Sequence, residues 1–275
     1  MKKVVLLTAV LLLTATGLAQ GQEGELHGTV DLTYLSKYIW RGFDVFGDKS
    51  AIQPSVNLDL FGTGLGFSIM GHRANSSGFE NTERWDWTLY YRNSLLDDKP
   101  YATQYMIGWV YYNYPDSSTK VADLQEIHTV LSWPKLLPIE GLVPTYCIVK
   151  LWPSNSGALV ASRVDLTTGL PSTGTASGWA HIFMLDYGLT VPGFVPETPE
   201  QVINLHMEVV YNDGVGPAGQ MVDHDWSNAV FGISTSFDLG NNLSFTPGLY
   251  YQSSWDDSVD PEDEFWVSLG MAYKF

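Results

Sequence analysis

The 275-residue sequence contains a single cysteine, Cys147, so no disulfide can form within one chain. Basic residues are also few, because 14 Lys and Arg residues stand against 30 Asp and Glu residues, for a formal net charge of −16. Nucleic-acid phosphates are bound by clustered cations, so this balance argues against a nucleic-acid partner. Beyond the first 20 residues, no apolar run reaches the roughly 20 residues that a membrane-spanning helix needs.

The first residues, MKKVVLLTAVLLLTATGLAQ, combine two lysines, an apolar run and a small-residue segment ending at Ala19. This order is typical of a secretory signal peptide over residues 1–19, with a retained membrane anchor as the alternative. We therefore predict that residues 20–275 are exported and form one domain.

The last segment, EFWVSLGMAYKF, carries a large apolar residue at every second position up to Phe275. Strict alternation of this kind predicts a β-strand with one apolar face. About twelve such segments of about 10 to 14 residues recur along the chain. They begin near Leu26, Ala51, Leu65, Glu83, Tyr101, Leu124, Val143, Gly178, Gln201, Ser227, Leu243 and Glu264.

The lengths of the segments and of their connections indicate how these strands close. Tilted membrane strands need about 9 to 11 residues, and exported barrels favour even strand numbers. Long polar connections follow the odd segments, whereas shorter connections, several of them Pro-rich, follow the even ones. We predict an all-β fold, a single antiparallel up-and-down transmembrane β-barrel of about 12 strands with short periplasmic turns and longer extracellular loops. The alternative is a soluble β-sandwich, which would bury its apolar faces against each other.

The C-terminal stripe resembles the terminal signature of bacterial outer-membrane proteins, which ends on Phe with apolar residues at alternate positions before it. The resemblance implies that Phe275, Tyr273 and Met271 form an assembly signal for the barrel-assembly machinery. It also implies an outer-membrane location in a Gram-negative-type bacterium, with outer-membrane lipid as a partner.

A second resemblance rests on SKYIWRGFDV and the following AIQ. This stretch is similar to the first hairpin of the TorF-type porin family of uncharacterised outer-membrane proteins. The matching residues are Ser36, Tyr38, Arg41, Gly42, Ile52 and Gln53. The resemblance implies a barrel and a pore without an established substrate, and it brings no catalytic residues and no cofactor.

Charged residues of both signs fall on the predicted lumen face, as a water-filled passage or a plug of ion pairs would require. Arg41 is predicted either to fold inward, towards Asp59 or Asp86, or to remain a solvated loop residue. Cys147 is predicted to face lipid. The candidate residues of the lumen or its constriction are Arg41, Asp59, Arg84, Asp86, Arg92, Lys150, His206 and Glu208.

Neither an enzyme nor a metal site is favoured by the sequence. His224 and Ser227 are three residues apart, so on a strand they face opposite sides and do not form a catalytic pair. The last long loop is acidic and could offer oxygen ligands to Ca²⁺, although it lacks the spacing of an EF-hand loop. These weak candidates are Asp256, Asp257, Asp260, Glu262, Asp263 and Glu264.

We therefore predict a narrow, weakly cation-preferring porin or channel for small solutes or ions. A plugged structural or surface-interaction barrel is the first alternative. A lipid-modifying outer-membrane enzyme is the second.

Overall fold

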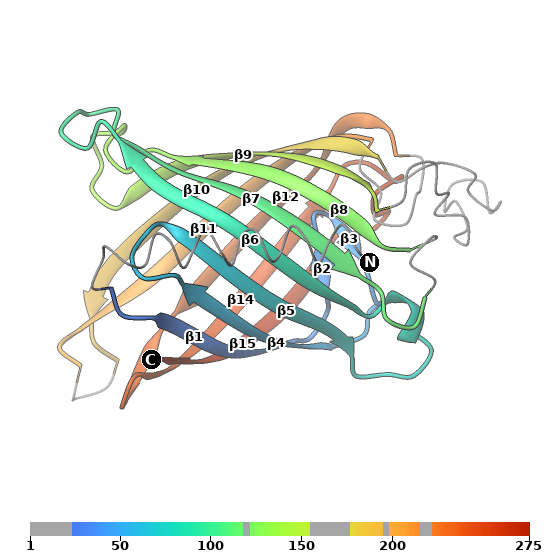
Figure 1. The fold of residues 1–275 in the computed structure, drawn as a ribbon, viewed down its shortest axis with the longest axis horizontal. Coiled ribbons are helices and arrows are strands. Elements are labelled where there is room, and N and C mark those ends of the chain that lie inside the picture. The colour runs from blue at the N-terminus through green and yellow to red at the C-terminus, as the bar shows by residue number, and fades with distance from the viewer. Residues whose placement is uncertain (1–23, 118–121, 155–176, 195–197, 215–221) are drawn as a thin grey trace.

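The computed structural model describes residues 24–117, 122–154, 177–194, 198–214 and 222–275 (Figure 1). The predicted signal peptide lies outside these residues. Within them, the only helix is a short 3-10 turn, Glu80–Thr82, and no helix has the length and apolar character to cross a membrane.

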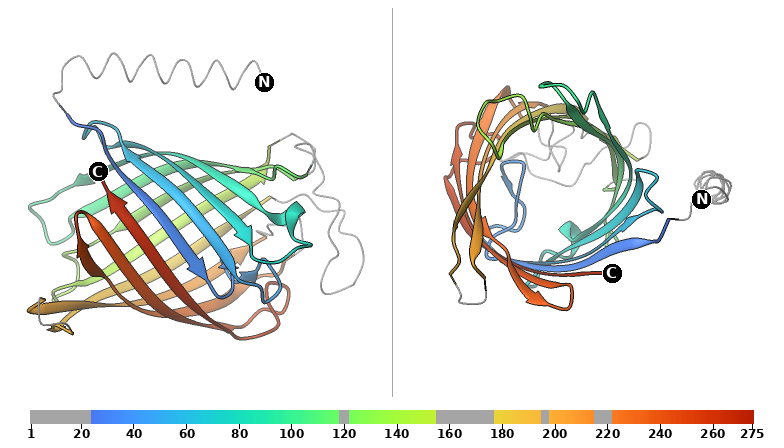
Figure 2. Two further views of the ribbon diagram at one scale, coloured as in Figure 1. Left: turned by 90° about the horizontal axis from the view of Figure 1, so that it is seen from below. Right: turned by 90° about the vertical axis from the view of Figure 1, so that its left-hand side faces the viewer.

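Twelve strands form one closed antiparallel ring, as the alternation predicted (Figure 2). In chain order they are β1 (His27–Leu35), β4 (Ala51–Asp59), β5 (Leu65–Ala74), β6 (Arg84–Leu95), β7 (Thr103–Asn113), β8 (Leu124–Ser132), β9 (Leu142–Pro153), β10 (Gly178–Pro192), β11 (Glu200–Asp213), β12 (His224–Thr235), β14 (Leu243–Ser254) and β15 (Glu264–Lys274). The short strand β13 (Phe237–Gly240) pairs with β14 beside the end of β12.

The ring closes where the first strand meets the last. Leu32 of β1 pairs with Met271 of β15 on one side and with Pro54 of β4 on the other. At the end of this seam, Gly28 and Phe275 exchange two backbone hydrogen bonds of 3.0 Å. A Cβ atom on Gly28 would lie only 2.4 Å from the Phe275 ring, so a glycine is needed for the terminal ring to pack there. The C-terminal residue is therefore held in the sheet.

Around much of the ring, a strand has an apolar outer face and a more polar inner face, because neighbouring side chains point to opposite sides. On β6, Trp85 and Trp87 are about 40% exposed, whereas Arg84 and Tyr90 on the other face are buried. A soluble sandwich would bury such tryptophans, so the outer face is apolar as in membrane-spanning barrels.

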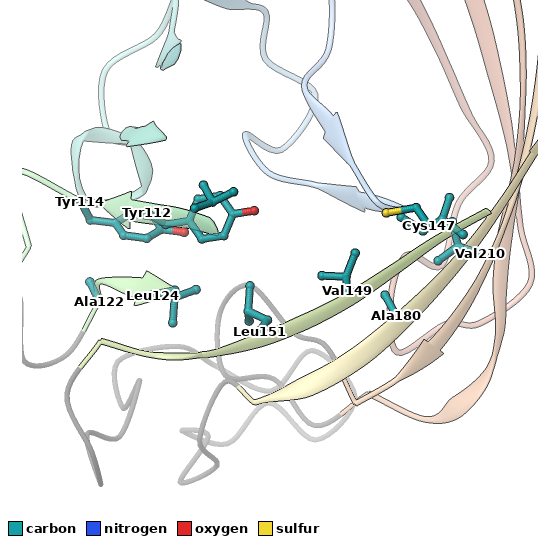
Figure 3. Close-up of a cluster of buried hydrophobic side chains, with 11 residues drawn as sticks. Tyr112, Tyr114, Ala122, Leu124, Cys147, Val149, Leu151, Ala180 and Val210 are labelled. Carbon is teal, nitrogen blue, oxygen red and sulfur yellow. The ribbon is translucent and has the colours of Figure 1, made fainter. Parts of the chain in front are cut away.

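On strand β9, the side chains predicted to face lipid face the lumen, and those predicted to face the lumen face outward. Cys147 pairs with Val130, and Val149 and Leu151 on the same side of β9 have no exposed surface (Figure 3). Lys150 instead pairs with the exposed Ile127, so it lies on the outer face. The prediction that Cys147 faces lipid and Lys150 faces the lumen is therefore wrong. The strand is apolar on both faces, so period two alone could not tell which face is inside.

The two ends of the ring differ. The long connections lie at what we call the long-loop end, and their described residues are 36–50, 75–83, 114–117, 122–123, 154, 177, 214, 222–223 and 255–263. The shorter connections lie at the short-turn end, and their described residues are 60–64, 96–102, 133–141, 193–194, 198–199 and 236–242. Both the start of β1 and the end of β15 lie at the short-turn end (Figure 1).

The first long connection folds back inside the ring (Figure 2). It forms a hairpin of β2 (Ile39–Trp40) and β3 (Phe43–Asp44), here called the inner hairpin. Its two-residue turn is Arg41–Gly42, and both residues have positive φ angles, 52° and 94°. Turns of this kind match the twist of two-residue hairpins and favour glycine. Gly42 is also confined, because an added Cβ would lie 2.7 Å from Asn228 Oδ1.

Candidate functional site

The tip of the inner hairpin forms an ion pair with the barrel wall. Both terminal nitrogens of Arg41 donate to Glu126 on β8, at 2.7 and 2.9 Å. Glu126 is buried and also accepts a hydrogen bond from the Tyr112 hydroxyl at 2.7 Å. His128 Nδ1 lies 2.9 Å from its second oxygen. A bidentate pair with these extra partners fixes the orientation of the Arg41 side chain.

A second polar cluster supports the root of the hairpin from strands β5 and β6. Arg84 on β6 donates to the Tyr38 hydroxyl at 3.0 Å, and its Nε lies 2.9 Å from Asp86 Oδ1. His72 lies 2.9 Å from the other Asp86 oxygen and stacks on Tyr38, with ring centroids 4.8 Å apart. The buried arginine is therefore matched by a carboxylate, as burial of a charge requires.

A third contact comes from the opposite wall. Gln252 on β14 has no exposed surface and donates to the Gly42 carbonyl at 2.8 Å. Its side-chain oxygen accepts from Asn228 of β12 at 3.4 Å. Polar side chains of strands β5, β6, β8 and β14 thus hold the inner hairpin, and it spans the lumen between them.

Apolar packing completes the attachment. Trp40 packs against all three buried apolar clusters, and the largest of them lines β7 to β11 around Val149 and Leu151 (Figure 3). The Trp40 ring also lies under two cations, with the Arg41 and Arg84 guanidinium carbons each 4.6 Å from its centre. Cation–π contacts of this kind are strengthened when water is excluded.

The structure separates the predicted site residues into groups. Asp59, Arg84, Asp86, Arg92, His206 and Glu208 lie on the inner face, and Arg41 lies in the inner hairpin. Arg41 does fold inward, but its partner is Glu126 and neither Asp59 nor Asp86. Asp59 instead pairs with Arg92 at 2.5 Å near the short-turn end. His206 lies 2.7 Å from Asp186, and Lys150 lies outside over Trp179.

Sequence reasoning missed Glu126, Gln252 and Asn228 as partners of the hairpin. Glu126 lies 85 residues from Arg41 along the chain, and no local pattern in the sequence links the two residues. Gln252 and Asn228 are polar residues at inner positions, and nothing in one sequence distinguishes them from other polar residues of a wet lumen.

His224 and Ser227 do not contact each other in the described part of the chain. His224 Nδ1 contacts Asp213, whereas Ser227 Oγ bonds Asn228 at 2.8 Å and Val210 at 3.3 Å. Residues 224–228 lie at the start of β12. This arrangement holds Ser227 as a buried structural hydroxyl.

The ring, its apolar outer face and its inward-folded first loop define a closed up-and-down β-barrel. The NanC porin has a TM-score of 0.53 to this structure at 10% sequence identity, covering 90% of this chain and all of the other. The KdgM porin, solved in complex with oligogalacturonate, has a TM-score of 0.49 at 9% identity, covering 90% and 99%. An outer-membrane channel from Pseudomonas putida F1 has a TM-score of 0.48 at 11% identity, covering 92% and 96%.

The likeness to the NanC porin shows a shared fold. No family model matches the sequence, and no curated protein matches it. The prediction of a porin-like barrel is therefore confirmed at the level of the fold, and the resemblance to the TorF-type family stays a prediction.

Proposed function

We propose that this protein is an outer-membrane channel of a Gram-negative-type bacterium that passes small solutes or ions through a lumen narrowed by the inner hairpin. One observation carries the proposal. The barrel is apolar outside, while inside it holds a hairpin fixed by the Arg41–Glu126 pair. Fixed charges across a lumen suit a passage for hydrated solutes. An apolar core would stabilise the fold at least as well if the interior had only a structural role.

The size of the barrel supports a narrow passage. Barrels of eight strands are filled by side chains, and those of 16 to 18 strands leave an aqueous channel. A 12-stranded ring lies between them, and the inner hairpin takes up part of its bore. At the short-turn end a pocket remains, lined by Arg92, Gln104, Met106 and Ser132 among others. This pocket is the vestibule expected below a constriction.

Weak cation preference belongs to the same proposal. The lumen arginines 41, 84 and 92 each lie beside a carboxylate, so they leave little net positive charge. The chain carries a formal net charge of −16, and a mouth lined by one sign of charge concentrates the opposite ion. Three of the six acids of the last loop are buried, namely Asp256, Asp260 and Glu264, so we expect the preference to be small.

Planar-bilayer recording tests the channel. We expect small single-channel currents from the wild type and larger ones from Trp40→Ala, which removes the side chain shared by all three clusters. Lys150→Ala is the matched control, because this side chain lies on the outer face. A reversal potential under a KCl gradient should show cation preference at low salt that fades near 1 M, where the Debye length is about 3 Å. Anion preference at low salt would contradict this assignment.

The plugged structural or surface-interaction barrel is the competing function. The packing of Trp40 against three apolar clusters is the observation that favours it. Such a barrel gives no current as wild type, even when it is correctly inserted. Current only after Trp40→Ala would support a plug in place of a passage.

Orientation is tested on intact cells. We propose that the long-loop end faces outward, so a cysteine replacing the exposed Asp257 should react with an impermeant maleimide. A cysteine replacing the exposed Glu140, at the short-turn end, should not react. Each variant carries Cys147→Ser so that only the new thiol is read. The reverse pattern would invert the topology.

A further inference from the structure

The pocket at the short-turn end, here called the vestibule pocket, is built on three consecutive strands. It has a volume of about 410 Å³, within the range of about 300 to 1,000 Å³ that small-molecule sites occupy. Its inward-facing lining comes from β6, β7 and β8 and consists of Arg92, Ser94, Gln104, Met106, Val130 and Ser132. The pocket therefore lies on one continuous patch of the inner wall.

Strand pairing sets these side chains in two neighbouring rows. In the row nearer to the inner hairpin, Met106 pairs with Arg92 on one side and with Val130 on the other. The next row, towards the short-turn end, consists of Ser94, Gln104 and Ser132. The Cβ atoms of directly opposite residues lie about 4.5 to 5.5 Å apart, so each row forms one surface. The first row joins an apolar floor to a cation, and the second is polar throughout.

Arg92 does not give the vestibule pocket a net positive charge. Its guanidinium lies 2.5 Å from the Asp59 carboxylate, while 57% of its side chain remains exposed. Beside the second row, Ser94 donates to the Asp97 carboxylate at 2.8 Å, and the Lys135 ammonium donates to the Asp97 carbonyl at 2.5 Å. Cations and carboxylates therefore accompany each other around the pocket. This balance suits a neutral solute, because an ion would find no unmatched charge of opposite sign.

Three side chains of the pocket keep hydrogen-bonding capacity for a solute. The exposed Gln104 amide has no hydrogen-bond partner among the described residues, so it offers a donor and an acceptor. The Ser132 hydroxyl accepts from Thr145 at 2.9 Å and retains its own proton for donation. Asp59 engages one terminal nitrogen of Arg92, which leaves the other N–H groups of the guanidinium available. Donors and acceptors are both present, as solute hydroxyl groups require.

We propose that the vestibule pocket binds a neutral polyhydroxylated ring, the chemistry of a monosaccharide. The C–H face of such a ring packs against Met106 and Val130. Hydroxyl groups at its edge meet Gln104, Ser132 and Arg92. This division follows the general pattern of ligand pockets, in which an apolar lining carries a few polar groups that fix orientation. The inference rests on the proposed channel function and deepens it by naming a class of solute.

The vestibule pocket adjoins the constriction. Val130 packs against the large buried apolar cluster that Trp40 of the inner hairpin also contacts. His128 lies at the next inward position along β8 and contacts Glu126, the partner of Arg41. A solute held in the pocket therefore lies beside the hairpin, at the entry to the narrowed part of the lumen.

Saturation-transfer NMR on the folded full-length barrel in deuterated detergent tests the site, with methyl β-glucoside as the neutral probe and glucuronate as its charged counterpart. We expect saturable transfer to the glucoside and weaker transfer to glucuronate, because Asp59 already pairs with Arg92. Gln104→Leu should weaken glucoside binding by about tenfold, since it removes the hydrogen bonds of the amide and keeps a side chain of similar size. Asn204→Leu is the matched control, because this exposed amide lies on the inner face of β11, outside the pocket.

Asp59→Asn is the decisive variant, because it predicts a gain. Without the carboxylate, the Arg92 guanidinium can form a charged pair with glucuronate. The ratio of glucuronate affinity to glucoside affinity should therefore rise by about tenfold over the wild type. A misfolded barrel cannot produce that gain, and heat-modifiable migration on gels checks the folding of the other variants.

The readouts separate this inference from the channel itself. A wild type that conducts ions but shows no transfer to the glucoside overturns the inference and leaves the channel in place. A barrel that binds the glucoside but conducts no ions keeps the binding site and overturns its role in transport. Tighter binding of glucuronate than of the glucoside by the wild type would overturn the neutral class of solute. An equal loss of binding in Asn204→Leu would overturn the location.

Discussion

Replacing Arg41 by Met should show how strongly the inner hairpin is held. The substitution keeps an unbranched apolar side chain but leaves Glu126, whose side chain is 1% exposed, without its bidentate partner. Removing one member of a buried ion pair typically costs about 3 to 5 kcal/mol. Here Tyr112 and His128 still contact Glu126, so we expect the lower end, about 3 kcal/mol.

The second single variant is Glu126→Gln, and the double variant Arg41→Met/Glu126→Gln completes a double-mutant cycle. Because the two residues contact each other directly, the effects of the single variants should not add. We expect a coupling energy of about 1 to 3 kcal/mol, with the double variant less destabilised than the sum of the two. Arg73→Met is the control. The Arg73 side chain is 79% exposed, and its ion pair with Glu83 is long, at 3.6 Å. Exposed pairs of this kind contribute about 0 to 1 kcal/mol.

Two assays distinguish a loss of stability of the whole barrel from local undocking of the inner hairpin. Urea unfolding in lipid vesicles, followed by tryptophan fluorescence, gives the change in unfolding free energy. Hydrogen exchange at the Trp40 and Phe43 amides reports undocking of the hairpin while the ring remains folded. Unchanged stability and unchanged exchange in Arg41→Met would refute the reasoning. Strictly additive single variants would show that the two side chains do not interact as the structure places them.

Three further outcomes are expected. Cys147 should resist an impermeant maleimide in the folded barrel and react after unfolding, because it is 7% exposed on the inner wall; rapid labelling of the folded protein would show that this wall is open. Deleting Phe275 should lower the yield of inserted barrel without changing export, since the terminal residue exchanges two hydrogen bonds with Gly28; normal levels of heat-modifiable barrel would contradict the assembly signal. Burial, with the nearby Glu264 and Asp44 charges adding to it, raises the pKa of Asp260 to about 6, so its ionisation should lower stability as the pH rises from about 4 to 6. Asp260→Asn should flatten that dependence, and an unchanged slope in urea unfolding at several pH values would argue against it.

The sequence by itself determined the approximate number and position of the strands of the ring. An alternating stripe is visible wherever one face meets an apolar environment and the other meets polar groups, as on β6 and β15. The difference between long and short connections likewise gave the two ends of the ring, because consecutive antiparallel strands must turn at alternate ends. These features are local, so a single sequence contains them.

Only the tertiary structure decided which side of β9 is inner and which residues hold the hairpin. Where both faces of a strand are apolar, period two does not fix its facing, and pairing with β8 and β10 settles it. The partners of Arg41 lie on a strand 85 residues away, chosen by how far the hairpin reaches across the ring. Phe43 of the hairpin and Val259 of the last loop are likewise neighbours only in the folded barrel. Such contacts depend on the closed shape of the barrel, so no local pattern in the chain encodes them.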